Sequence, residues 1–66
     1  MFKKYRQLRG LTQEELAELL NKDVRTVQRI ENEELIPTLK NFKALIKILK
    51  ISDKDIINYL KKKDQV

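Results

Sequence analysis

The stretch TQEELAELLNKDVRTVQRIEN, residues 12–32, carries the start and stop signals of two short helices joined by a tight turn. Thr12 followed three residues later by Glu15 forms a capping-box pattern, which marks a helix start. Asn21 tolerates the left-handed backbone that ends a helix, and Asp23 can cap the next helix. Apolar residues recur at helical spacing after each cap. The pattern predicts helices over about residues 13–20 and 24–32.

The rest of the chain also favours helix, because apolar residues recur three and four apart and there is one Gly and one Pro. Gly10 ends a first helix, Pro37 with Thr38 opens a fourth, and Ser52 with Asp55 caps a fifth. We therefore expect an all-α fold, a compact five-helix bundle. We assign residues 1–60 to this domain and residues 61–66 to a basic, frayed C-terminal tail.

Length and composition limit the chemistry. A chain of 66 residues is one domain that buries only about 60% of its unfolded surface, so its core is small. It contains no cysteine and no histidine, and therefore lacks thiolate and imidazole groups. We expect no enzyme activity, no cofactor, no metal and no small-molecule ligand. The carboxylates Glu14, Glu15 and Glu18 fit a solvated helix face better than a catalytic pair.

Charge and hydropathy point to a class of partner. Fifteen Lys and Arg against ten Asp and Glu give a net charge of +5, which favours a polyanionic partner. Basic character alone does not identify that partner, since many small Lys-rich domains are basic for solubility. No apolar run is long enough to cross a membrane, and the basic start is not followed by a signal-peptide core. We expect a cytoplasmic protein with no membrane partner.

The helix over residues 24–32 has an unusual outer face. If its apolar residues point into the core, Arg25, Gln28 and Arg29 share the opposite side. Arginine fits the O6 and N7 atoms of guanine, and glutamine fits the N6 and N7 atoms of adenine. Such a face can read a base sequence, although the same residues also suit an ordinary solvated helix. Val24 can touch a thymine methyl group or fill a corner of the core.

Two helices joined this tightly suggest a helix-turn-helix crossing, and the spacing of further residues resembles one family. From about Tyr5 to Ile57 the chain resembles the Cro and phage-repressor type of helix-turn-helix family, also called the XRE family. The residues that carry the resemblance are Arg6, Thr12, Gln13, Leu16, Ala17, Val27, Ile30, Glu31 and Pro37. The resemblance implies a lambda-repressor-like bundle whose third helix lies in the DNA major groove. It also implies a transcriptional regulator of double-stranded DNA, with repression the expected outcome, that binds a palindromic operator as a homodimer.

The resemblance assigns roles to individual residues. Those expected to read bases are Val24, Arg25, Gln28 and Arg29. Those expected to contact phosphates are Arg9, Gln13, Lys40 and Lys43. Gln13 begins a helix, where unpaired N–H groups and the helix dipole favour an anion. Arg6 and Glu31 are expected to form an ion pair that ties the first helix to the third.

The acidic turn after the third helix departs from the family. Many relatives have Asn-Gly and then a basic residue, whereas this chain has Asn32-Glu33-Glu34, which reverses the charge near the phosphates and removes the glycine. The departure leaves a second hypothesis open: a protein-interaction module, antitoxin-like or regulator-binding, on the same fold. The surface expected to hold a second copy or a partner comprises Leu35, Ile36, Ile57, Tyr59 and Leu60.

Overall fold

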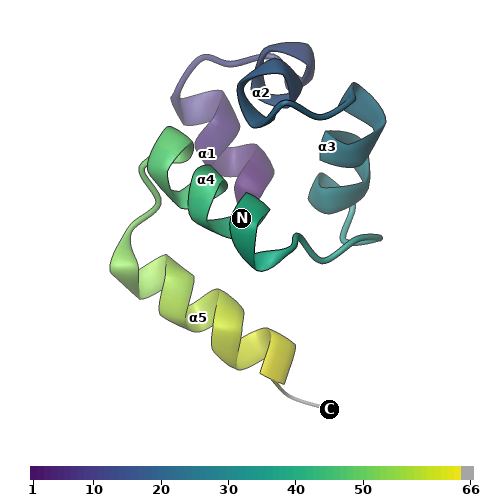
Figure 1. The fold of residues 1–66 in the computed structure, drawn as a ribbon. Helices are drawn as coiled ribbons and strands as arrows, with labels where there is room; N and C mark the ends of the chain where they lie inside the picture. Colours follow the sequence, from purple (N-terminus) through teal and green to yellow (C-terminus); the bar gives the residue numbers. More distant parts are fainter. Residues whose placement is uncertain (65–66) are drawn as a thin grey trace.

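The structure is a computed structural model that describes residues 1–64, and that part of the chain forms five α-helices and no strand (Figure 1). The helices are α1 (Phe2–Leu8), α2 (Gln13–Leu20), α3 (Val24–Glu31), α4 (Leu39–Leu49) and α5 (Asp53–Asp64). The all-α bundle predicted from the apolar spacing is confirmed. The bounds predicted for two of the helices, residues 13–20 and 24–32, agree with α2 and α3 to within one residue.

Local capping fixes the turn between α2 and α3. The Thr12 hydroxyl accepts a hydrogen bond from the Glu15 N–H at 3.0 Å, and the Glu15 carboxylate accepts one from the Thr12 N–H at 2.9 Å. Asn21 ends α2 in the left-handed region with φ 57°. The Asp23 carboxylate then caps α3 by accepting from the Thr26 N–H at 2.9 Å, and hydrogen bonds from Thr26 lower the pKa of Asp23. The predicted caps are therefore present, and they set the direction in which α3 leaves α2.

The core lies between α1, α2, α3 and α4. Its largest fully buried side chains are Leu16, Val27, Leu45 and Leu49. Burying one such side chain contributes about 1.5–3 kcal/mol, so a few of them account for much of the stability of a small domain. Because Val27 and Ile30 form the buried side of α3, the opposite side of that helix faces outward.

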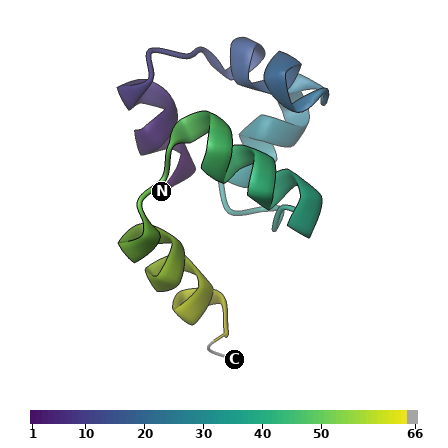
Figure 2. The ribbon, with the colours of Figure 1, turned by 60° about the vertical axis from the view of Figure 1, so that its left-hand side comes forward.

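Helix α5 lies at one end of the bundle in both views (Figures 1 and 2). Its first turn is held by polar contacts with α1. The Tyr5 hydroxyl donates to the Asp55 carboxylate and accepts from the Ser52 N–H at 3.3 Å. The hydrogen bond from Tyr5 is the main cause of a lowered pKa for Asp55.

An aromatic cluster holds the middle of α5. The Tyr59 ring lies 5.2 Å from the Phe2 ring and 5.5 Å from the Phe42 ring, measured between centroids. These distances are typical of attractive aromatic pairs. Burial is the larger of two causes that raise the pKa of Tyr59, and the nearby Glu33 carboxylate is the other. Tyr59 thus belongs mainly to the contact between α5 and the core.

Helix α5 continues through residues 61–64, which belong to the C-terminal tail predicted to be frayed. The Lys63 ammonium lies 5.5 Å from the centroid of the Tyr59 ring one turn earlier, a cation–π arrangement. Lysines in the last turn also interact favourably with the negative end of the helix dipole. Residues 65–66, the remainder of the predicted tail, lie outside the described residues.

The turn after α3 adopts a conformation that normally requires glycine. Glu33 has φ 61°, and the N–H groups of Glu33 and Glu34 donate to the Ile30 and Arg29 carbonyls at 3.2 and 2.8 Å. This is the Schellman pattern of helix ends, whose left-handed position usually holds glycine. A side chain at that position costs about 1–2 kcal/mol. The turn therefore has the left-handed geometry that glycine adopts easily, and it carries backbone strain because Glu33 occupies that position.

Glu33→Gly should raise the free energy of unfolding by up to about 1 kcal/mol, because relief of strain outweighs the extra entropy of glycine in the unfolded chain. Urea denaturation would measure the difference. Glu33→Ala is the matched control, since it removes the carboxylate but keeps the strained Cβ. A glycine variant less stable than the alanine variant would contradict the strain at this position.

Candidate nucleic-acid interface

The outer face of α3 consists of three exposed polar side chains, Arg25, Gln28 and Arg29. They lie opposite the buried Val27 and Ile30. The sequence pattern had placed the same three residues together because they are spaced three and four apart on a helix. Two guanidinium groups and one amide give this face donors for anions and for base edges.

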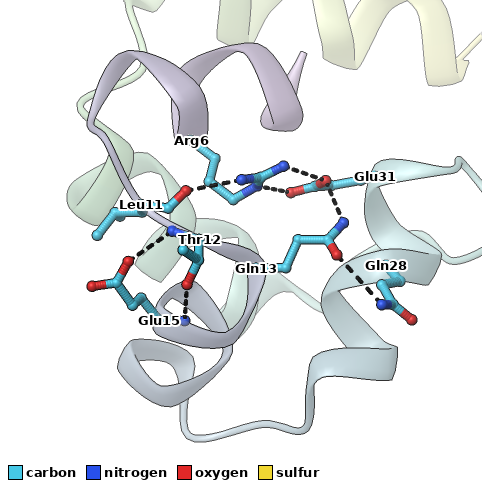
Figure 3. Close-up of polar contacts among 7 residues, drawn as sticks. All are labelled: Arg6, Leu11, Thr12, Gln13, Glu15, Gln28 and Glu31. Atoms are coloured by element: carbon cyan, nitrogen blue, oxygen red, sulfur yellow. Dashed lines mark hydrogen bonds and ion pairs between the residues drawn. The ribbon is translucent and has the colours of Figure 1, made fainter.

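An ion pair holds the end of α3 against α1. The Arg6 Nε donates to the Glu31 Oε2 at 2.6 Å, and the Arg6 Nη2 donates to the Glu31 Oε1 at 3.2 Å (Figure 3). A third donor, the Arg6 Nη1, reaches the Leu11 carbonyl at 2.8 Å. The Glu31 side chain is only 2% exposed. The pair implied by the family resemblance thus forms a bidentate contact in a nearly dry environment.

Gln13 connects this ion pair to the outer face of α3. Its Nε2 donates to the Glu31 Oε1 at 3.0 Å, and its Oε1 accepts from the Gln28 Nε2 at 3.3 Å (Figure 3). An ionised carboxylate only accepts hydrogen bonds, so the Gln13 nitrogen must face Glu31 and its oxygen must face Gln28. Gln28 therefore turns its nitrogen inward and keeps its oxygen and one N–H available to solvent. No local pattern predicts this link, because the two glutamines are fifteen residues apart.

The residues expected to contact phosphates divide into two groups. Lys40 and Lys43 are exposed in the first half of α4, and Gln13 is half-buried at the start of α2. Arg9 is engaged elsewhere: its Nε donates to the Leu49 carbonyl at 2.8 Å. That carbonyl lies at the end of α4, where unpaired C=O groups and the helix dipole attract a cation. Arg9 therefore caps the C-terminal end of α4, while its side chain remains exposed.

Val24 is half-buried and packs against the core. Of the two roles considered for it, filling a corner of the core is the one that this packing supports. A polar hollow on the outer side of α3 is lined by Arg25, Gln28, Arg29, Asn32 and Glu34. Sequence reasoning did not place Asn32 or Glu34 on this surface.

The two acids of the turn separate in space. Glu34 lines the polar hollow with the arginines of α3. Glu33 instead lines a groove between α1, α3 and α5, near Tyr59. The left-handed backbone at Glu33 reverses the chain at this point. Of the two acids in the turn, Glu34 is the one that shares the surface of Arg25 and Arg29.

That groove has a volume of about 250 Å³, and the sequence analysis did not anticipate it. Its apolar lining includes Phe2, Ile30, Leu35 and Tyr59. Leu35 and Tyr59 are half-buried against the core, whereas Ile36, Ile57 and Leu60 are 64%, 51% and 50% exposed. The surface expected to meet a partner thus has three residues free to make new contacts.

The described part of the chain was searched for metal-binding groups and for membrane-spanning helices. Among the side chains that the structure describes, those of residues 1–63, no group of three or more acidic residues is placed to hold a metal ion. Within the same range, no helix is long and apolar enough to span a membrane.

Comparison with known proteins shows the family to which the chain belongs. No curated protein and no solved structure matches the chain. The model of a family described as Helix-turn-helix matches residues 2–56, which include α1 to α4 and the capped start of α5. This family consists of DNA-binding regulators and is not known for enzymes. The chain belongs to the Cro and phage-repressor type (XRE) helix-turn-helix family of DNA-binding regulators.

Proposed function

We propose that the protein binds double-stranded DNA sequence-specifically, with α3 in the major groove, and represses transcription by occupying its operator. The observation that carries the proposal is the outer face of α3, where Arg25, Gln28 and Arg29 are exposed together and the Gln28 amide is oriented by Gln13. The family places its recognition helix at this position of the fold.

The geometry of Gln28 suits an adenine edge. Glutamine reads adenine by donating to N7 and accepting from N6, which requires one free N–H and one free oxygen. Gln28 retains both after its hydrogen bond to Gln13. Ordering a flexible side chain on binding costs roughly 0.5–1.5 kcal/mol, and the contact with Gln13 lowers this cost. Arg25 and Arg29 flank Gln28 and can each donate two hydrogen bonds to a guanine.

Phosphate contacts would fix the register of α3 in the groove. Lys40 and Lys43, together with the N-terminal end of α2, provide positive charge and N–H donors for this purpose. Gln13 can still donate its second amide hydrogen to a phosphate while it holds Gln28. In this mechanism the protein acts by occupancy and performs no chemistry.

The first test compares a base contact with a phosphate contact, after sites have been selected from random duplex DNA. Arg29→Ala should weaken operator binding by roughly 1–3 kcal/mol and relax the preference at one base pair, because a bidentate contact is lost. Titration of labelled duplexes by fluorescence anisotropy would measure both effects.

Lys43→Ala is the companion variant. It should weaken binding to all duplexes alike and reduce the slope of log affinity against log salt by about 0.9, because one phosphate contact is lost. Equal effects of the two variants on base preference would contradict the division between base and phosphate contacts.

We also propose that the protein binds a palindromic operator as a homodimer. One domain of this size reaches only a short half-site, and two copies about 34–36 Å apart would double the contacts. The exposed apolar residues Ile36, Ile57 and Leu60 lie on the loop before α4 and on α5, and they are available for an interface. A small interface of this kind should make the dimer dependent on concentration.

Sedimentation analysis over a range of concentrations should show a monomer–dimer equilibrium. Ile57→Gln combined with Leu60→Gln should shift it to monomer. Leu8→Gln should not, since Leu8 is also exposed but lies at the C-terminal end of α1. A monomeric mass at high concentration, both free and on a palindromic site, would argue decisively against the dimer.

A further inference from the structure

Glu34 occupies an unexpected place for an acidic residue in a DNA-binding domain. It lines the same polar hollow as Arg25, Gln28 and Arg29, and its side chain is exposed. Its backbone is fixed to α3, because the Glu34 N–H donates to the Arg29 carbonyl at 2.8 Å. Glu34 therefore lies on the surface that α3 would present to a binding partner.

The carboxylate of Glu34 has no bonded partner within the hollow. Among residues 1–64, neither an ion pair nor a hydrogen bond joins its side chain to Arg25 or Arg29. On a surface that approaches phosphates, an uncompensated carboxylate weakens binding to every duplex. It contributes to binding only where the DNA supplies a hydrogen-bond donor.

Exocyclic amino groups are the donors that the major groove supplies. On its own major-groove edge cytosine presents the N4 amino group and no acceptor, and acidic side chains recognise it by accepting from that group. Adenine presents its N6 amino group next to N7, an acceptor that would repel a carboxylate. Guanine O6 and thymine O4 are acceptors and would repel it as well. Cytosine is therefore the base that best matches Glu34.

We propose that Glu34 is a specificity-determining residue that accepts a hydrogen bond from a cytosine amino group in the groove read by α3. This inference rests on the proposed function and adds a fourth base-reading residue to it. At the correct site the cytosine donor compensates the carboxylate, and at other sites it remains uncompensated. Glu34 thus lowers affinity for nonspecific DNA more than for the operator.

The test measures affinities of the wild type and Glu34→Ala for the selected operator, for each single-base-pair variant of it, and for an unrelated duplex. Glu34→Ala should bind the unrelated duplex more tightly. Its ratio of operator to unrelated affinity should fall by roughly fivefold to a hundredfold, the discrimination expected of one base contact. The loss of preference should be confined to one C·G pair.

Glu33→Ala is the matched control, because it removes the same charge from the adjacent residue on the side facing α5. It should leave every base preference unchanged. Tighter binding of Glu34→Ala to all duplexes by the same factor would overturn the inference and reduce Glu34 to a source of repulsion. Relaxation at an A·T pair would overturn the assignment to cytosine. A wild type without preference among duplexes would overturn the proposed function, and this inference with it.

Discussion

Arg6→Ala should lower the free energy of unfolding by about 3–5 kcal/mol, the cost of removing one partner of a buried ion pair. The variant leaves the Glu31 carboxylate, whose side chain is 2% exposed, without its bidentate partner. It also removes the donor to the Leu11 carbonyl. Since small domains are stable by only about 5–15 kcal/mol, this loss should be visible as a large fall in the urea midpoint.

Two further variants separate the lost ion pair from lost packing. Glu31→Ala should be similarly destabilising, because it leaves a buried guanidinium. Arg6→Met combined with Glu31→Leu should recover most of the stability, since apolar pairs of similar volume often replace buried ion pairs without loss. Unchanged stability in both alanine variants would show that the pair does not hold α1 to α3, and that part of the family register is wrong.

Replacing the whole outer face of α3 should produce the largest functional effect. The triple variant Arg25→Ala, Gln28→Ala, Arg29→Ala removes three contacts worth roughly 1–3 kcal/mol each in base discrimination. The ratio of operator to random-duplex affinity should fall at least about a hundredfold, even if the three effects are not additive. Because all three side chains are exposed, the free energy of unfolding should change little.

The control for this variant is Lys40→Ala combined with Lys43→Ala, which also removes two positive charges, but from α4. It should lower both affinities and leave their ratio nearly unchanged. If the triple variant also left the ratio unchanged, α3 would not be the reader. The interaction-module hypothesis would then become the better account of the protein.

The helices could be predicted because their signals are local. Each cap involves a side chain that accepts from the N–H group three residues ahead, as Thr12, Asp23 and Ser52 do. Four consecutive residues are therefore enough to predict each cap. The outer face of α3 could be predicted for the same reason, since helical periodicity alone places Arg25 with Gln28 and Arg29. The pairing of Arg6 with Glu31 came from the family resemblance and could not have come from local pattern.

Other features depend on contacts between distant residues or on the exact path of the turn. Arg9 bonds to a carbonyl forty residues away, which no local pattern indicates. The link between Gln13 and Gln28 likewise requires the angle between α2 and α3. The separation of Glu33 from Glu34 follows from a positive φ at a residue that is not glycine, which sequence preferences argue against.

The attachment of α5 has a consequence for motion. The helix is held by the contacts of Tyr5 with Ser52 and Asp55 and by the packing of the Tyr59 ring, while Ile57 and Leu60 remain exposed. An element held by few contacts opens at a lower free energy than the whole domain, and its amide protons exchange with solvent sooner. The residues that orient Gln28 all belong to α1, α2 and α3. Detachment of α5 would therefore leave the outer face of α3 preorganised. In the proposed homodimer, conditions that detach α5 would weaken assembly with a second copy and leave the recognition of a half-site unaltered.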